Sequence, residues 1–527
     1  MKPHRLWLCT TLIVLFWAAN VLAQAKTEQL GRVHFPVSCG SATQIKFDRA
    51  IALLHSFWYS EGVKAFTAVT EADPSCAMGY WGIAMSHWYP LWQPPSEAML
   101  KKGWEAVEQA KTLGGKTERE REYIAAIEVF YKDAQTLDHR TRALGYEKAM
   151  ERLNARHPED REAAVFYALA LNATILATDK TYANQLKAAE ILEKVFAEQP
   201  DHPGVAHYLI HSYDYPPLAS RGLNAARRYA KIAPSAPHAL HMPSHIFTRL
   251  GLWQESIASN HNSAAASKEY NSVFEQFHAL DYQAYGYLQG AQDLEAKRVL
   301  DERNALAKGD LAHFASAYAF AAIPARYALE RRQWAEAAAL EPHPSPVKYS
   351  EGLTYFARAI GAARGGDAMG TRANVDKLQA LHTALMDAKQ DYWAGQVEIQ
   401  HRAAAAWLAR AEGKHEEAIR LMGAAADLED TTGKHPVTPG QLLPARELFG
   451  ELLLELNKPA QALQEFEASM PKEPNRFNGL YGAARAAELA GDVEKAGTYY
   501  GKLVALCERS DTDRPELQQA KAFLAKK

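Results

Sequence analysis

The chain carries little net charge and has no long apolar run after its first residues. A formal net charge of −3 leaves no basic surface of the kind that binds nucleic acid, so nucleic acid is not expected as a partner. No later segment is long enough and apolar enough to span a bilayer, so no transmembrane segment is expected in the mature chain. Alternating runs of Val, Ile and Thr are also missing, whereas Ala, Leu, Glu and Lys dominate. The composition therefore predicts an all-α protein.

Several motifs that mark catalytic or phosphate-binding sites are absent. The sequence contains no Gly-rich phosphate loop, no Gly-x-Ser-x-Gly turn and no Cys-x2-Cys pair. A zinc-protease helix carries Glu directly after the first histidine of His-x3-His, but Tyr208 and Met242 occupy those places here. No Pro/Gly/Ser-rich linker divides the chain either, so one continuous array is expected rather than several domains.

The amino terminus has the pattern of a secretory signal peptide. Lys2, His4 and Arg5 precede an apolar run over residues 6–19, and small residues follow around Ala23 and Ala25. An uncleaved membrane anchor is the alternative, but the run is shorter than the roughly 20 residues that span a bilayer. We therefore expect residues 1–25 to be removed and the mature protein to be secreted or periplasmic.

Cysteine is scarce, and three of the four cysteines remain after the signal peptide. In an oxidising compartment two of them can pair. Cys39 with Cys76 would tie an amino-terminal arm, residues 26–45, to the second helical pair, and Cys507 would then be a buried thiol. The alternative is that all three stay unpaired.

A 34-residue period is visible near the carboxyl terminus. Asn457, Ala462 and Phe466 are matched 34 residues later by Gly491, Ala496 and Tyr500. Pro200 and Pro234 show the same spacing, each at the expected end of a helix. A small residue at the position of Ala462 and Ala496 lets two helices cross closely. This period is that of the tetratricopeptide repeat.

With this period the chain resembles the tetratricopeptide repeat family over nearly its whole mature length. Segments such as 76–82 (CAMGYWG) and 240–247 (LHMPSHIF) also look like secreted bacterial repeat proteins without an established activity. The resemblance implies an α-solenoid of stacked helical hairpins over residues 46–527, wound into a right-handed superhelix with a concave groove. Insertions near residues 90, 175 and 265 interrupt the pattern, and each could cap the groove.

Histidine is concentrated in the middle of the chain, where residues 202–278 hold eight of the 20. The resemblance implies that the second, fifth and ninth residues of each first helix line the groove. The side chains that this register places on or beside those positions are His207, His211, Asp214, His238, His241, His245, His278, Asp281 and Tyr285. Spacings of three, four and seven place side chains on one helical face in any case. The pattern predicts a ligand-binding surface that leaves out His202 and His261.

Three interpretations of this histidine pattern stay open: packing residues with satisfied ring nitrogens, a site for a carboxylate, peptide or polyol, and a site for a divalent transition metal. The His-x3-His pairs His207/His211 and His241/His245 offer two imidazoles each, as a metal site requires. Asp214 or Asp281 would serve as a further ligand or would orient a ring. Pro243 should bend or break the helix and move His238 away from His245.

Two functions follow from different classes of protein. The favoured hypothesis is a binding protein that holds a partner protein, peptide or small ligand in a histidine-rich groove, because repeat arrays mostly bind. The alternative is a metal-dependent hydrolase or oxidoreductase that uses the same histidines, with metal-bound water as a nucleophile. The sequence marks no general base, so no catalytic residue is assigned.

Overall fold

The computed structural model describes residues 28–91, 94–306 and 311–526. This part of the chain consists of α-helices, one short 3-10 helix and connecting segments. The expected signal peptide, residues 1–25, lies outside the described residues. Within them, no helix combines the length and apolar character needed to cross a bilayer. The all-α prediction is confirmed.

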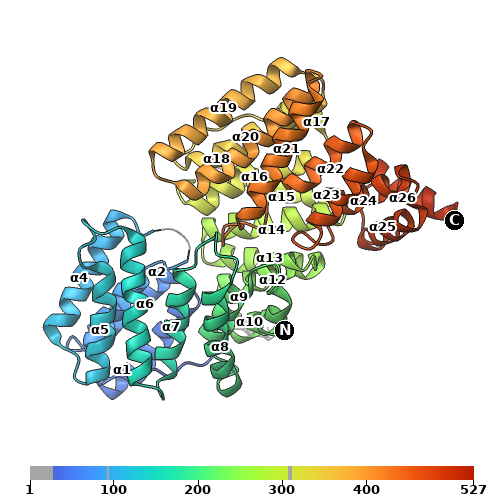
Figure 1. The fold of residues 1–527 in the computed structure, drawn as a ribbon. Helices are drawn as coiled ribbons and strands as arrows, with labels where there is room; N and C mark the ends of the chain where they lie inside the picture. Colours follow the sequence, from blue (N-terminus) through green and yellow to red (C-terminus); the bar gives the residue numbers. More distant parts are fainter. Residues whose placement is uncertain (1–27, 92–93, 307–310, 527) are drawn as a thin grey trace, which may run out of the picture.

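The helices form three consecutive groups along the chain (Figure 1). The first group comprises α1 (Ser41–His55), α2 (Tyr59–Ala72), α3 (Ala77–Ser86), α4 (Glu97–Leu113), α5 (Glu118–Tyr131), α6 (His139–Arg156) and α7 (Arg161–Ala173). The second comprises α8 (Ala183–Glu198), α9 (Pro203–Tyr213), the 3-10 helix η1 (Ala219–Gly222), α10 (Leu223–Ile232), α11 (Pro237–His241), α12 (Pro243–Arg249) and α13 (Trp253–Glu269). This middle group connects the two ends of the molecule in Figure 1.

The third group holds the carboxyl-terminal half. It comprises α14 (Val273–Gln289), α15 (Asp293–Leu306), α16 (Phe314–Glu330), α17 (Trp334–Ala338), α18 (Lys348–Arg364), α19 (Ala368–Asp387), α20 (Asp391–Ala411), α21 (His415–Thr431), α22 (Ala445–Glu455), α23 (Pro459–Ser469), α24 (Phe477–Leu489), α25 (Val493–Leu506) and α26 (Pro515–Ala525). Most helices pack on the next one in sequence, as stacked hairpins do. The predicted α-solenoid of stacked helical hairpins is confirmed.

The 34-residue period corresponds to a repeated turn and a repeated close packing. Asn457 and Gly491 both have positive φ, 56° and 83°, in the tight turns that end α22 and α24. Phe466 of α23 is fully buried between Gly450 and Gly482, where an added Cβ would approach its ring to 2.6 Å and 2.2 Å. The small residues therefore allow three successive helices to pack together.

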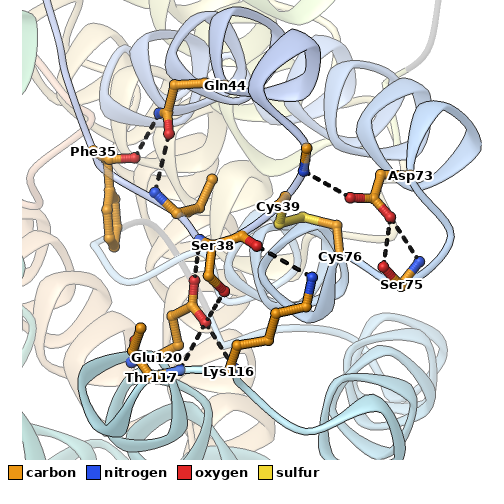
Figure 2. Close-up of a disulfide and its surroundings, with 12 residues drawn as sticks. Phe35, Ser38, Cys39, Gln44, Asp73, Ser75, Cys76, Lys116, Thr117 and Glu120 are labelled. Atoms are coloured by element: carbon orange, nitrogen blue, oxygen red, sulfur yellow. Dashed lines mark hydrogen bonds between the residues drawn. A yellow bond between two sulfur atoms is a disulfide. The ribbon is translucent and has the colours of Figure 1, made fainter.

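The amino-terminal arm is fastened by a disulfide and by carboxylates, among them Glu120 and Asp73 (Figure 2). Cys39 is bonded to Cys76, the pairing that the sequence favours, and Cys507 is a buried free thiol. Glu120 accepts hydrogen bonds from the backbone N–H and the hydroxyl of Ser38, both over 2.6 Å. The first helix begins at Ser41 rather than at the expected residue 46, so the arm is shorter than the sequence suggests.

A segment between α21 and α22, residues 432–444 and here called the covering loop, packs against helices far away in sequence. Lys434 forms an ion pair with Asp214 over 2.7 Å, and the Tyr282 hydroxyl donates to the carbonyl of Thr438 over 3.1 Å. Arg326 of α16 donates to the carbonyls of residues 440 and 441. The covering loop thereby joins the carboxyl-terminal half to the helices that carry the clustered histidines.

Candidate metal centre

All six predicted site histidines meet where the middle group packs against α14, and we call them the histidine cluster. They are His207 and His211 of α9, His238 and His241 of α11, His245 of α12 and His278 of α14. Their side chains are between 0 and 7% exposed. The sequence analysis placed them on an open groove, and this is wrong in one respect: neighbouring helices and the covering loop enclose them.

Pro243 breaks the helix as its chemistry predicts. One helix ends at His241 and the next begins at Pro243, whose missing N–H costs nothing at a first helical position. The histidine cluster forms two groups, and the boundary between them lies between His238 and His241 of α11 rather than at the break. His238 joins His207 and His211 in the first trio, whereas His241, His245 and His278 form the second trio.

The two trios are compact and adjacent. Within each trio, one ring nitrogen from every histidine lies within 4.8 Å of the others. The rings of His238 and His241 are 5.9 Å apart between centroids, and those of His211 and His245 are 6.0 Å apart. Nitrogen ligands of one metal ion lie roughly 3 to 3.6 Å from each other, so small ring rotations suffice to complete either site.

In the second trio, two imidazole nitrogens face each other without a hydrogen between them. Nδ1 of His241 donates to the amide oxygen of Asn260 over 2.6 Å, and the Asn260 amide nitrogen donates to the Ser256 carbonyl, which fixes the orientation of that amide. Nδ1 of His245 donates to Asp214 over 2.9 Å. In neutral rings both Nε2 atoms then carry lone pairs, yet they lie 2.9 Å apart. A metal ion between the two nitrogens, or a proton on one of them, relieves this arrangement.

In the first trio one ring, that of His207, is anchored in a similar way. Nδ1 of His207 donates to the backbone carbonyl of His55 over 2.7 Å, and its Nε2 lies 3.1 Å from Nε2 of His211. The His207 ring is stacked on Tyr229, with ring centroids 5.2 Å apart. The carbonyl and the stacked ring together hold the His207 lone pair toward the other histidines.

Burial favours the neutral form of these rings. It is the largest cause that lowers the pKa of His207, His211, His241 and His278 well below the ordinary value near 6.5, and mutual repulsion among protonated rings adds to it. Burial also lowers the pKa of His245 to about 4, although Asp214 opposes this shift. Neutral imidazole is the form that coordinates metal ions.

Asp214 supports the cluster from outside it. The carboxylate lies at the end of α9 and contacts His245, Arg249 and Lys434 over 2.7 to 2.9 Å. Burial alone would raise the pKa of Asp214, but Lys434 and Arg249 outweigh it and hold that pKa well below its ordinary value. An ionised carboxylate that accepts from a histidine Nδ1–H is the usual orienting group behind a metal ligand.

A third group of buried histidines has a different character. His55 and His202 both contact Glu162 through Nε2, over 2.9 and 2.8 Å. Their Nδ1 atoms accept hydrogen bonds, from the Tyr208 hydroxyl for His55 and from the Val205 backbone N–H for His202. Every ring nitrogen in this group has a complementary hydrogen-bond partner, and the three residues also lie close enough together to be a third possible set of metal ligands.

Asp281 and Tyr285 belong to other networks, contrary to their predicted place beside the histidines. Asp281 is paired with Arg326 over 3.2 Å. The Tyr285 hydroxyl accepts from Arg476 over 2.6 Å. About one and two turns along α14 from His278, these side chains meet the carboxyl-terminal half instead of α11 and α12. His261, also excluded from the prediction, is exposed on α13.

A cavity of about 560 Å³ lies next to the cluster. A smaller one of about 40 Å³ shares Leu91, Asn172, Tyr215 and other lining residues with it and reaches His211 and Asp214. The segments near residues 90 and 175, two of the three expected insertions, contribute to its wall, whereas residue 265 lies within α13. The larger cavity is therefore a route toward the histidines.

Three residues of the site were missed by the sequence analysis. Asn260 and Tyr282 lie on α13 and α14 without any motif that marks them. Lys434 lies more than 200 residues from Asp214 in sequence, so only the packing of the covering loop brings them together. Helical spacing was the only signal in the sequence. It could have found Tyr282, which lies four residues after His278 on the same face of the helix.

Comparison with models of protein families finds no match, and comparison with curated proteins finds none either. Similar solved structures include a human IFIT1 dimer with m7Gppp-AAAA, which is 11% identical with a TM-score of 0.40 and covers 82% of this chain and 90% of that one. Yeast Tom70 is 11% identical with a TM-score of 0.35, covering 92% and 95%. At these scores the likenesses carry no argument about function.

Proposed function

We propose that this protein binds transition-metal ions at the histidine cluster. The observation that carries the proposal is the 2.9 Å approach of Nε2 of His241 to Nε2 of His245 while both Nδ1 atoms donate elsewhere. Two facing lone pairs in a buried site repel unless a cation lies between them. All six donors are imidazoles, which suit zinc, copper, iron and nickel.

The packing interpretation accounts less well for these contacts. In the His55–Glu162–His202 group each ring nitrogen has a complementary partner, which shows how this interior accommodates histidines that only pack. The Tyr282 hydroxyl lies 3.3 Å from Nε2 of His245 and 3.1 Å from the Thr438 carbonyl, and it has one hydrogen to donate between these two acceptors. A metal ion satisfies the remaining lone pairs without a proton.

The cavity supports a second candidate, binding of a small organic ligand next to the metal. Its size of about 560 Å³ is that of an ordinary ligand pocket, and a smaller cavity that shares lining residues with it reaches His211. The sequence analysis expected a partner protein, peptide or small ligand, and in this proposal the small ligand enters the cavity. Metal-dependent catalysis on that molecule is the enzymatic form of the same proposal. The Cys39–Cys76 disulfide supports export to an oxidising compartment.

Metal analysis of untagged protein tests the proposal. The protein is incubated with zinc, copper or cobalt, desalted and examined by mass spectrometry for bound metal. We expect at least one stoichiometric ion in the wild type and in the control variant His261→Ala, which changes an exposed histidine. The double variant His241→Ala/His245→Ala should bind less metal than the wild type while its circular dichroism remains helical. Wild-type protein that retains no metal under all three conditions would refute the proposal.

A further inference from the structure

We infer that the histidine cluster holds two copper(I) ions, one on each trio. This inference rests on the proposed function and adds the number and the identity of the ions. Three observations support it: the division of the ligands, the separate anchoring of each trio and the charge of the surroundings.

The ligands divide into two complete sets that share no residue. The first trio supplies nitrogens from His207, His211 and His238, and the second supplies three from His241, His245 and His278. Three nitrogens within 4.8 Å of one another are enough for one ion. A single ion on the His241/His245 pair would leave the Nε2 atoms of His207 and His211, 3.1 Å apart, without a metal.

Each trio is anchored by its own groups. The His55 carbonyl fixes His207, and Glu275 lies 3.9 Å from Nδ1 of His238. In the second trio, Asn260 and Asp214 fix His241 and His245. The rings of each trio are therefore oriented by that trio's own neighbours. Ring centroids of the two trios lie about 6 Å apart, so the two sites are side by side.

The charge around the cluster favours ions of low charge. Asp214 lies against two cations, Lys434 and Arg249, so this group already carries a net charge of +1. Glu275 is the carboxylate beside the first trio. Two divalent ions would bring four positive charges into this buried site, whereas two copper(I) ions bring two. Soft thiolate and thioether ligands favour copper(I) most strongly, but among the metals that imidazole binds copper is the one with a stable monovalent state.

Titration with copper(I) without oxygen tests both the number and the identity. Full-length untagged protein competes with a chromophoric copper(I) chelator, and we expect two equivalents in the wild type and in His261→Ala. His211→Ala removes a ligand of the first trio and His278→Ala a ligand of the second, so each should retain one equivalent. If either variant loses its helical circular dichroism, His211→Gln or His278→Gln replaces it.

The outcomes separate this inference from the proposed function. The two-ion assignment would be overturned if the wild type bound one equivalent, or if either folded single variant lost both equivalents. The proposed metal site would remain in either case. Displacement of copper(I) by an equal concentration of zinc would overturn the copper assignment alone. Absence of any bound metal would overturn the proposed function itself. Two equivalents that survive equimolar zinc would support the whole inference.

Discussion

Nδ1 of His245 donates a hydrogen bond to Oδ2 of Asp214 across 2.9 Å, and this contact connects the histidine cluster to the covering loop through Lys434. The carboxylate keeps the His245 ring in the tautomer whose Nε2 faces His241. A side chain at the end of α9 therefore determines the direction of a ligand on α12, and a loop between α21 and α22 holds that side chain in place.

Replacement of Asp214 tests this orienting role. Asp214→Asn keeps the shape of the side chain but removes the charge that faces Lys434 and Arg249. Loss of an orienting carboxylate typically lowers metal affinity about 10- to 100-fold, and we expect that range here. Competition with a metal chelator measures it. Asp301→Asn, at an exposed ion pair on α15, is the control and should bind as the wild type does. Equal affinity of Asp214→Asn and wild type would contradict the orienting role.

The His55–Glu162–His202 group should affect stability without affecting metal binding. Glu162→Gln keeps one acceptor but turns an amide N–H toward a second N–H donor, so one buried hydrogen bond is lost. The expected cost is about 1–3 kcal/mol of unfolding free energy, measured by urea denaturation. Metal content should equal that of the wild type. A loss of metal in folded Glu162→Gln protein would show that this group belongs to the metal site.

A carboxyl that lines the cavity should make stability depend on pH. Burial raises the pKa of Glu429 from about 4.5 to about 8, although the Ala445 backbone N–H opposes the shift and neighbouring carboxylates add to it. The folded state therefore holds a proton that the unfolded state releases, and this stabilisation is complete below pH 4.5 and is lost as pH rises through 8. Glu429→Gln stays neutral and should be more stable than the wild type by about 1–3 kcal/mol at pH 9.

The same pair of proteins should unfold alike at pH 4.5, where Glu429 is protonated in the folded state. Urea denaturation at both pH values gives the comparison. If the wild type and Glu429→Gln differed in unfolding free energy by the same amount at both pH values, Glu429 would be ionised in the folded protein at neutral pH.

The disulfide should contribute through the unfolded chain. Cys39 and Cys76 are 37 residues apart, and closing a loop of that length stabilises a protein by about 3–4 kcal/mol in the loop-entropy account. We expect the double variant Cys39→Ser/Cys76→Ser to lose about that much stability in urea denaturation. Addition of a thiol reductant to the wild type should produce the same loss, whereas the double variant should not respond to it. A wild type that does not respond to reductant would mean that this bond is absent.

The repeat architecture could be predicted from sequence because its signals are local. Asn457 and Gly491 end helices at a fixed period, and Phe466 fits between small residues on both sides. The break at Pro243 could be predicted for the same reason, and so could the separation of His238 from His245. The burial of the histidine cluster could not be predicted in this way, because it depends on the covering loop. Lys434 of this loop pairs with Asp214, which lies far away in the sequence.

The candidate site was predictable only along each helix. Helical spacing aligned His207 with His211 and His241 with His245, and the structure brings these pairs together. The same spacing aligned Asp281 and Tyr285 with His278, yet α14 turns those side chains toward Arg326 and Arg476. A long helix crosses several neighbouring helices, so residues on one face can contact different partners. Sequence spacing gives the face of the helix but not which neighbour each residue contacts.

Anomalous X-ray diffraction from crystals of untagged protein loaded with copper(I) tests the central claim most directly. Data collected on both sides of the copper absorption edge locate the metal without reference to any variant. The account predicts strong anomalous density within about 2.2 Å of Nε2 of both His241 and His245. Crystals with full copper content whose density lies only at exposed histidines such as His261, with none in the histidine cluster, would contradict it.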